Sequence, residues 1–317
     1  MYDLIGNTPM IEILYKYKGR ERKVYAKLEY YNLTGSIKDR MVFYVLNKNK
    51  KNGIIKDGVP LIEATSGNTG ISLAALGASL GHPVYIFMPD FVSIERIKLV
   101  ESYGAHITLI SKEEGSYEEC IRRADTLAKE INGYRLDQFK NTDNIEAHYQ
   151  TTGTEIIKQL KKVDGFVSGI GTGGTLMGIG LKIKESNENA KIAVIEPSTM
   201  TLLTSTPIIG QHQIEGIADG FIPPIVDQNK IDDFFTIEDK DAIVMSQKLA
   251  SVLGLGVGIS SGANLLGSIL LEDKIGGNVV TVFPDDSKKY LSTSYSTKIG
   301  DLHSLSDEIE LLEYTIV

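Results

Sequence analysis

The feature that most constrains the fold of this chain is a repeated alternation between short apolar runs and longer segments with helical periodicity. Apolar runs of buried-strand length occur at residues 61–64, 84–88 and 106–110, and each is followed by a segment whose apolar residues recur at helical spacing. Strands that are separated by helices pair in parallel, because the helix carries the chain back to the start of the next strand. The sequence therefore predicts an α/β protein.

A second series of the same kind follows a break in this pattern. Residues 137–144 are polar and predict a loop, a helix is expected at 145–160, and further strand-like runs occur at residues 166–168, 192–195 and 279–283. The polar tail, residues 301–317, contains apolar residues that predict a short amphipathic helix, namely Ile309, Leu311 and Leu312. Two such series predict two open, mainly parallel sheets with flanking helices and a cleft between them.

We place the domain boundary at the polar break. The smaller N-terminal α/β domain is expected to span residues 39–144, and the larger α/β domain is expected to combine residues 1–38 with 145–317. The length of 317 residues is sufficient for two domains of about 150 residues each. The hydrophobic content of 42% and the 31 glycines are typical of a compact α/β protein.

Charge and hydropathy exclude several classes of partner. The formal net charge of −8 disfavours nucleic acid and anionic membrane surfaces, because both require a basic face. No run approaches the roughly 20 apolar residues of a membrane span, and the N-terminus lacks the pattern of a signal peptide. A small ligand is therefore the expected partner.

The cysteine and histidine residues bear on the compartment of the protein and on whether it binds a metal. A single cysteine, Cys120, excludes an intrachain disulfide and a Cys-x-x-Cys metal site, and none of the five histidines has metal-ligand spacing to another. We therefore expect a cytoplasmic protein without a metal, and Cys120 is expected at a buried helix position.

One lysine stands where chemistry is possible. Lys38 lies in the stretch from Asn32 to Arg40, after a strand-like run and before a segment with helical periodicity. An exposed lysine has a pKa of about 10.4 and is a poor nucleophile at neutral pH, so a chemical role requires imine formation or desolvation. The alternative is a solvated lysine beside Asp39 and Arg40.

Two loops between a predicted strand and a predicted helix offer polar groups to a ligand. Residues 171–175, Gly-Thr-Gly-Gly-Thr, place backbone N–H groups and a helix N-terminus where they can converge on an anion such as phosphate. The sequence matches neither the dinucleotide fingerprint nor the P-loop, so a tight turn without a ligand is the alternative. Residues 65–69 add hydroxyl and amide groups that suit a carboxylate, and the alternative there is a capped helix.

These stretches occur in the order and spacing of a known family. The chain resembles the cysteine synthase and cystathionine β-synthase family of fold type II pyridoxal-phosphate enzymes from residue 4 to residue 295. The resemblance rests on Ile5 to Pro9, Gly35 to Arg40, Thr65 to Gly70, Tyr103 to Ala105, Asp137 to Phe139, Asn144, Ala147 to Tyr149, Gly171 to Thr175, Glu215 to Ile217 and Gly258 to Ala263.

The resemblance implies a role for each matching residue. Lys38 becomes the lysine that forms the imine with pyridoxal 5′-phosphate, and Asn68 becomes the partner of the cofactor's 3′-oxygen. Ser260 becomes the hydroxyl at the pyridine nitrogen, with Ser261 as the alternative. The phosphate is expected in a cup formed by Gly171, Thr172, Gly173, Gly174 and Thr175. The substrate is expected to contact Thr65, Ser66, Thr69, Gln138 and Gly216. A homodimer is also implied.

The family chemistry is β-replacement on an amino acid. A neutral hydroxyl at the pyridine nitrogen, unlike a carboxylate, does not hold this nitrogen protonated, and the cofactor is then a weaker electron sink that favours β-elimination over transamination. Lys38 is expected to remove the α-proton, the group on Cβ leaves to give an aminoacrylate, and a nucleophile then adds. The expected reaction is that of a cysteine synthase, in which O-acetylserine and sulfide give L-cysteine.

Two carboxylates depart from the family pattern and leave the direction of the reaction open. Asp219 lies in Ala218 to Gly220, where the family commonly has Gly-Ala-Gly, and Asp232 lies in a segment that returns to the cleft in this family. Both are solvated loop acids in one interpretation. In the other, one of them is a base that activates water, which needs a base where sulfide does not. The alternatives are therefore a lyase that converts L-cysteine and water to L-serine and hydrogen sulfide, and a serine or threonine deaminase.

Overall fold

The computed structural model describes residues 2–204, 206–297 and 304–317 of the chain. The described strands are β1 (Met10–Tyr17), β2 (Arg20–Leu28), β3 (Leu61–Ala64), β4 (Val84–Pro89), β5 (His106–Ile110), β6 (Tyr134–Arg135), β7 (Gly165–Gly169), β8 (Lys191–Pro197), β9 (Asp233–Ile237), β10 (Val279–Phe283) and β11 (Ile309–Ile316). The described α-helices are α1 (Lys38–Lys51), α2 (Asn68–Leu80), α3 (Ile94–Ser102), α4 (Ser116–Glu130), α5 (Asp143–His148), α6 (Thr154–Gln159), α7 (Gly174–Ser186), α8 (Asp239–Leu253) and α9 (Ile259–Ile275).

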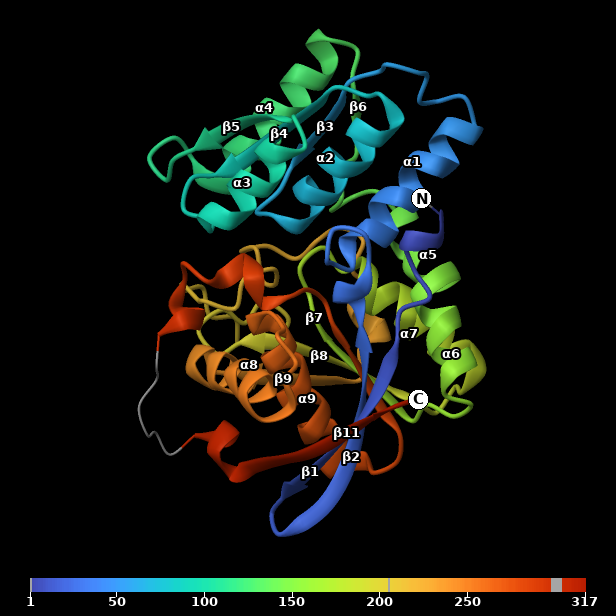
Figure 1. The fold of residues 1–317 in the computed structure, drawn as a ribbon, viewed down its shortest axis with the longest axis vertical. Helices are drawn as coiled ribbons and strands as arrows, with labels where there is room; N and C mark the ends of the chain where they lie inside the picture. The colour runs from blue at the N-terminus through green and yellow to red at the C-terminus, as the bar shows by residue number, and fades with distance from the viewer. Residues whose placement is uncertain (1, 205, 298–303) are drawn as a thin grey trace.

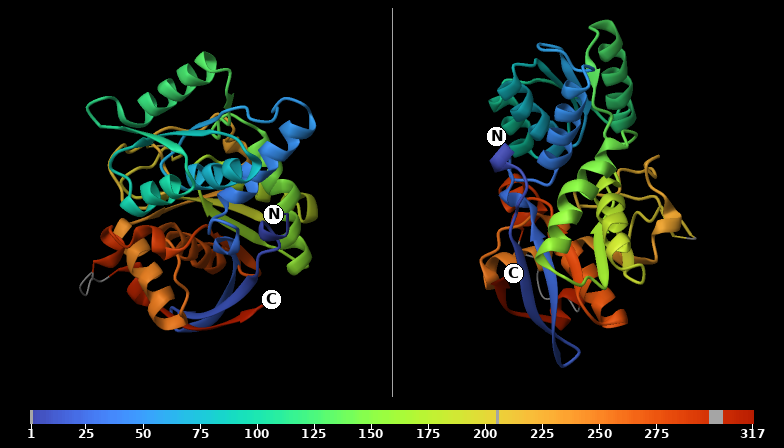
Figure 2. Two further views of the ribbon diagram at one scale, coloured as in Figure 1. Left: turned by 45° about the horizontal axis from the view of Figure 1, so that its top comes forward. Right: turned by 90° about the vertical axis from the view of Figure 1, so that its right-hand side faces the viewer.

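The strands form two sheets that occupy opposite ends of the molecule (Figures 1 and 2). The smaller sheet has the order β5-β4-β3-β6, and all of its pairs are parallel. The larger sheet has the order β11-β1-β2-β10-β7-β8-β9, and its pairs are parallel from β2 to β9. The expected α/β architecture with two mainly parallel sheets is thus confirmed, and the proposed domain limits cut neither sheet.

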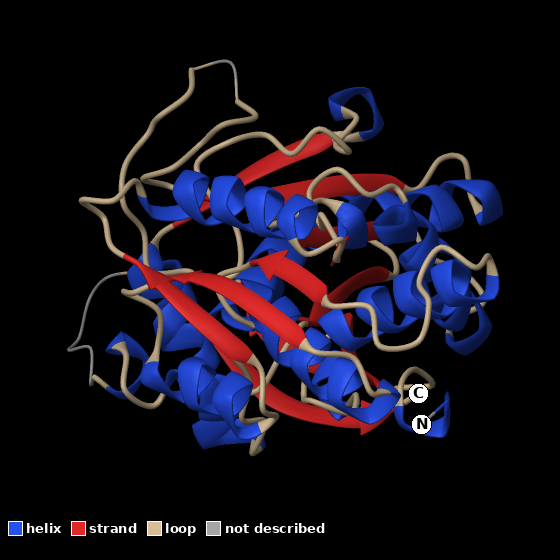
Figure 3. Ribbon diagram, turned by 90° about the horizontal axis from the view of Figure 1, so that it is seen from above, coloured by secondary structure: helices blue, strands red, loops and turns tan. Residues whose placement is uncertain are grey.

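Helices cover the faces of both sheets, as the view from above shows (Figure 3). Strand β3 is buried along its whole length, as expected for a strand with a layer on each face. Helix α2 packs so closely on this sheet that a Cβ on Gly77 would lie 2.2 Å from a methyl carbon of Val84. Helix α2 can approach the sheet this closely because residues such as Gly77 are small. Cys120 is fully buried on α4, as expected.

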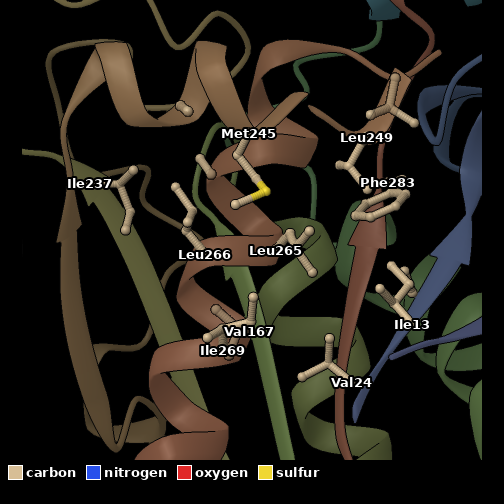
Figure 4. Close-up of a cluster of buried hydrophobic side chains, with 14 of the residues drawn as sticks. Ile13, Val24, Val167, Ile237, Met245, Leu249, Leu265, Leu266, Ile269 and Phe283 are labelled. Atoms are coloured by element: carbon tan, nitrogen blue, oxygen red, sulfur yellow. The ribbon is translucent and has the colours of Figure 1, made fainter. Parts of the chain in front are cut away.

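The core of the larger part lies between its sheet and helices α8 and α9 (Figure 4). Ile269 of α9 lies beside Val167 of β7, and Leu265 and Leu266 of α9 belong to the same cluster as Met245 of α8. Helix α9 is buried along nearly its whole length because it stands between the sheet and α8.

The expectation for the C-terminal tail is wrong. Residues 301–303 lie outside the described part of the chain, and a short 3-10 helix at Leu305–Glu308 is followed by the strand β11. This strand pairs antiparallel with β1, which brings the two ends of the chain side by side. Ile309 and Leu311 are buried and Glu310 between them is exposed, so the apolar residues follow the strand period of two and not the helical period.

The predicted helix at 145–160 is present but interrupted. A π-helical segment at Tyr149–Gly153 joins α5 to α6. Helix α7 crosses α5 and the start of this segment so closely that a Cβ on Gly178 would lie 2.3 Å from the carbonyl oxygen of Ile145 and 2.9 Å from the backbone nitrogen of Tyr149. This contact fixes the position of α7, whose N-terminus points into the region between the sheets. Among the residues that the model describes, no helix is long and apolar enough to cross a membrane.

Candidate active site

A cavity of about 800 Å³ of space, partly open to solvent, lies between the two sheets. Its lining comes from the carboxyl ends of β3, β7 and β10 and from the first turns of α1, α2, α7 and α9. Ligands of open α/β sheets bind at the carboxyl ends of the strands, where several helix N-termini converge. The cavity is therefore the candidate active site.

Lys38 is the first residue of α1 and lines the cavity. The turn before it is tied to the larger part of the molecule, because Ile37 N–H donates to the Pro284 carbonyl oxygen at 2.8 Å. The side chain is half-buried, and desolvation lowers the pKa of its ammonium group, although the carboxylates of Asp219 and Asp285 act in the opposite direction. A lowered pKa makes the neutral, nucleophilic amine more accessible near neutral pH.

The two charged neighbours of Lys38 do not form a solvated cluster with it. Asp39 is buried and accepts hydrogen bonds from Thr34 Oγ1 and Ser72 Oγ, both at 2.6 Å. Arg40 is buried and pairs with Glu29 at 2.6 Å and with Glu155 at 2.7 Å. The alternative of a solvated lysine beside two solvated charges is thus wrong, since both neighbours are engaged elsewhere.

The loop between β3 and α2 forms one wall of the cavity. Thr65, Ser66, Asn68 and Thr69 all line it, together with Gln138. Thr69 Oγ1 donates to Gln138 Oε1 at 2.6 Å, and Gln138 Nε2 donates to the Ala64 carbonyl oxygen at 3.1 Å. The expected carboxylate-binding residues are therefore brought together and braced by one another.

Asn68 connects this wall to the other side of the cavity. Its Nδ2 donates to Asp285 Oδ2 at 2.7 Å, and Tyr290 O–H donates to the same carboxylate oxygen at 2.6 Å. Asn68 Oδ1 is buried and has no hydrogen-bond partner among the described residues. A buried amide oxygen of this kind is normally satisfied, so a polar ligand is expected beside it.

The glycine-rich loop lies between β7 and α7 and forms the opposite wall. Gly173 has a φ of +91°, and a Cβ on Gly171 would lie 2.5 Å from the Gly216 carbonyl oxygen. A Cβ on Gly174 would lie 2.0 Å from Asn144 Oδ1, and Asn144 Nδ2 in turn donates to Thr172 Oγ1 at 2.9 Å. The loop is thus held in a conformation that only glycine permits at these positions, with the N-terminus of α7 facing the cavity.

The geometry also distinguishes between Ser260 and Ser261, the two candidates for the hydroxyl at the pyridine nitrogen. Ser260, near the start of α9, lines the cavity. Ser261 is fully buried and does not contribute to the lining that the described residues form. Ser260 is therefore the serine that can meet a ligand.

Asp219 reaches the cavity from a loop after β8. Ala218 N–H donates to the Ile170 carbonyl oxygen at 2.8 Å, and Ala218 has a φ of +55°, a left-handed conformation that is unfavourable for alanine. The side chain of Asp219 is half-buried. Desolvation raises the pKa of this carboxyl group, and the positive charge of Lys38 opposes the rise.

Asp232 lies outside the cavity, and the expectation that its segment returns to the cleft is wrong. Its carboxylate accepts a hydrogen bond from Ile192 N–H at 2.9 Å and pairs with Lys184 at 3.0 Å. These contacts hold it just before β9, at the edge of the larger sheet. They also lower the pKa of Asp232, despite partial burial.

The structure adds residues that the sequence did not point to. Tyr117 of α4, Arg96 of α3 and Tyr290 line the cavity, beside Glu215, which belongs to a stretch that carries the resemblance. The Arg96 side chain forms an ion pair with Glu215, and its guanidinium carbon lies 4.7 Å from the centre of the Tyr290 ring. The sequence shows Tyr117 and Arg96 only as polar members of amphipathic helices, so local periodicity carries no signal for them.

These features fit pyridoxal phosphate. The glycine-rich loop and the start of α7 supply N–H groups for a phosphate, Lys38 supplies an amine that is partly shielded from water, and Asn68 supplies a buried polar atom that lacks a partner among the described residues. The neutral Ser260 hydroxyl faces the same space.

Comparisons with known proteins agree with this fit. A family model described as pyridoxal-phosphate dependent enzyme matches residues 1–285. A probable cysteine synthase from Bacillus subtilis is 38% identical over 304 residues, covering 92% of this chain and 95% of that protein. The solved structure of a hydrogen sulfide-producing enzyme from Fusobacterium nucleatum is 50% identical with a TM-score of 0.96, covering 100% of this chain and 97% of the other.

A cysteine synthase from Entamoeba histolytica is more distant in sequence. Its structure is 34% identical with a TM-score of 0.86 and covers 96% of this chain and 92% of the other. Both kinds of relative thus share the whole fold. The chain belongs to the family of pyridoxal-phosphate-dependent enzymes and is an enzyme of cysteine synthase-like type.

Proposed function

We propose that this enzyme converts L-cysteine and water to L-serine and hydrogen sulfide. The observation that carries the proposal is the position of Asp219, which lines the same cavity as Lys38. Sulfide attacks without a base at neutral pH, whereas water requires one. A carboxylate beside Lys38 has no evident use in cysteine synthesis and a direct use in the addition of water.

The substrate is held by its carboxylate in this proposal. Thr65, Ser66 and Thr69 offer hydroxyl and N–H groups at the N-terminus of α2, and Gln138 adds an amide. The bonds that brace Thr69 against Gln138 keep these donors together before the substrate arrives. A preorganised loop loses less conformational entropy when the ligand binds.

The cofactor supplies an aldehyde that condenses with the substrate amine and a ring that delocalises the electron pair left at Cα. Gly171, Thr172, Gly173, Gly174 and Thr175 would hold its phosphate, Asn68 would contact its 3′-oxygen, and the Ser260 hydroxyl would meet its pyridine nitrogen. Ser260 is a neutral partner, which disfavours transamination.

Lys38 and Asp219 divide the proton transfers. Lys38, with the lowered pKa of its amine, removes the proton from Cα, and the bond between Cβ and sulfur breaks. Asp219 then takes a proton from water while the water oxygen bonds to Cβ, and Lys38 returns its proton to Cα. The raised pKa of Asp219 makes its carboxylate a stronger base than an ordinary aspartate. The net change is replacement of sulfur by oxygen at Cβ, without oxidation or reduction.

The relative from Fusobacterium nucleatum named as a hydrogen sulfide-producing enzyme supports this direction, because it shares half of its residues with this chain. The test is a comparison of substrates under the same conditions. We expect sulfide and serine in equal amounts from L-cysteine, and slower formation of cysteine from O-acetylserine and sulfide. Cysteine synthesis as the dominant reaction would favour the cysteine synthase alternative, and pyruvate or 2-oxobutyrate from serine or threonine would favour the deaminase.

A homodimer belongs to the same proposal, because it rests on the resemblance to the family. Analytical ultracentrifugation of the cofactor-loaded enzyme is expected to give twice the mass of the chain, and a monomer would contradict it.

A further inference from the structure

A tyrosine stands at the passage between the cavity and a wider outer chamber. Tyr117 and Asp219 each line both the inner cavity and a wider outer chamber that adjoins it. Tyr117 comes from α4 on the smaller sheet, whereas Asp219 comes from the loop after β8 on the larger part. The two side chains therefore approach the passage from different parts of the molecule.

Aromatic contacts join the supports of these two side chains. The Tyr117 ring meets the edge of Phe139 with centroids 5.6 Å apart and planes at 90°, and Phe139 contacts Phe221 with centroids 4.9 Å apart. Phe221 follows Asp219 by two residues in the same loop. Edge-to-face aromatic pairs stabilise a defined geometry. The position of Tyr117 is thus linked to that of Asp219 through packed rings.

The hydrogen bonds of Tyr117 leave its oxygen able to accept. A phenol has one donor hydrogen and two acceptor lone pairs. The Tyr117 hydroxyl donates its hydrogen to the Ala64 carbonyl oxygen at 3.0 Å, and the one hydrogen bond that it accepts from the described residues is a long contact of 3.4 Å from Gln138 Nε2. At least one lone pair is therefore free for a further donor from the passage.

We propose that the Tyr117 oxygen and the Asp219 carboxylate together bind the water molecule that attacks Cβ. This inference rests on the proposed function. One O–H bond of the water breaks as its proton passes to Asp219, and the water oxygen bonds to Cβ. The double bond that loss of sulfur leaves between Cα and Cβ becomes single, and Lys38 returns a proton to Cα. The other hydrogen of the water, donated to Tyr117, remains on the serine hydroxyl. Tyr117 thus orients the attacking lone pair.

The protonation state of Tyr117 is compatible with this role. Burial and the nearby charge of Asp219 raise the pKa of the phenol well above its ordinary value. The group therefore stays protonated at neutral pH, keeps its bond to Ala64 and offers only its lone pairs to the water.

The test is Tyr117→Phe, which keeps the aromatic ring and removes the oxygen. The Ala64 carbonyl oxygen keeps its bond from Gln138, so no buried acceptor is left without a partner. Tyr15→Phe is the matched control, because Tyr15 is also buried and donates to Glu272 at 2.9 Å, on the face of the larger sheet away from the cavity. Thermal unfolding of both cofactor-loaded variants shows whether either has a folding defect.

The decisive measurement is the competition between water and a thiol for the same bound substrate. With L-cysteine and 2-mercaptoethanol present together, we expect Tyr117→Phe to lower the ratio of serine to thioether by about tenfold, the effect of one hydrogen bond. Sulfide release in the first turnover should be unchanged, because it precedes the addition of water. A thiolate has no hydrogen to donate to Tyr117, so thioether formation should persist.

Several outcomes would overturn the inference. An unchanged ratio of serine to thioether would remove Tyr117 from the water site while leaving the proposed function intact, and equal slowing of sulfide release and serine formation would indicate only a structural role. A parent enzyme that makes no serine would remove both proposals.

A crystal structure of the parent should also show a water about 3 Å from both the Tyr117 oxygen and Asp219, a typical hydrogen-bond distance. Its absence from a well-ordered site would contradict the inference.

Discussion

Asp219 and Asp232 are the same side chain placed in two different environments. Asp219 lies on a loop that enters the cavity, where burial raises its pKa and the charge that most opposes this rise is that of Lys38. Asp232 lies at the start of β9, where a backbone N–H and two lysines surround the carboxylate and its pKa is lowered. The comparison shows that the chemistry of a carboxylate here is decided by its surroundings. In the proposed function Asp219 is the base, whereas Asp232 is a structural ion-pair partner.

The largest difference between the two aspartates is expected in catalysis. Asp219→Asn should slow serine formation from L-cysteine by at least about a hundredfold, the usual effect of losing a general base. Asp232→Asn should retain the parental rate, because this side chain lies outside the cavity. Steady-state assays of serine release on both variants provide the measurement. Equal losses of the rate of serine formation in the two variants would show that the two aspartates do not differ in catalysis.

The pH dependence should also distinguish them. The Asp219 carboxylate must be ionised to accept a proton, so serine formation should fall as the pH drops through its raised pKa, above the usual value of about 4 for aspartate. Asp219→Asn should lack this acidic limb, whereas Asp232→Asn should keep it. A pH profile of the rate of serine formation under conditions where water addition limits the rate measures this. An acidic limb that persists in Asp219→Asn would show that the titration of another group causes it.

The free energy of unfolding should depend on Asp232 and not on Asp219, the opposite of the expectation for catalysis. The lowered pKa of Asp232 means that its carboxylate stabilises the fold above its unfolded-state pKa, and this contribution is lost as the pH falls through its folded-state pKa. Asp232→Ala should therefore lower the free energy of unfolding at neutral pH by about 1 kcal/mol. The raised pKa of Asp219 has the opposite consequence, so Asp219→Asn should leave this free energy unchanged or increase it. Urea unfolding of the two variants makes the comparison, and a larger loss in Asp219→Asn would contradict it.

The smallest effect concerns the backbone that carries Asp219. Ala218 adopts a φ of +55°, which costs a non-glycine residue about 1–2 kcal/mol. Ala218→Gly removes this cost but increases the entropy of the unfolded chain by an amount worth about 0.5–1 kcal/mol. The net expectation is a gain of about 0.5 kcal/mol in the free energy of unfolding, measured with urea. Gly19→Ala is a matched control of the opposite sign, since Gly19 has a φ of +73° on an exposed turn. A loss of stability in Ala218→Gly would show that the strain at this residue is negligible.

Much of this molecule was predictable from sequence because its signals are local. The apolar runs of β3, β4 and β7 are contiguous, and the glycines at 171, 173 and 174 follow a strand and precede a helix within a few residues. Lys38 is likewise located by the turn before it and the helix that it begins. A pattern that forms within about ten residues does not depend on the remainder of the fold.

The parts that escaped prediction depend on contacts between distant residues. Strand β11 forms because β1, at the other end of the chain, offers an edge to pair with. The apolar residues Ile309 and Leu311 are compatible with either structure until that partner is known. The same holds for Tyr117, whose role depends on rings and carbonyls that other segments bring to it. The position of Asp232 beside Lys184 and Lys191 also follows from sheet order and not from sequence spacing.

The addition of water at Cβ is the central claim, and labelled water tests it most directly. When the cofactor-loaded enzyme is incubated with L-cysteine in water enriched in heavy oxygen, mass spectrometry should show serine with one solvent oxygen in its hydroxyl group, formed in an amount equal to the sulfide released. Asp219→Asn should release sulfide in the first turnover without forming labelled serine at a comparable rate. Sulfide accompanied only by pyruvate, or no reaction with L-cysteine alongside rapid cysteine synthesis from O-acetylserine and sulfide, would contradict the account.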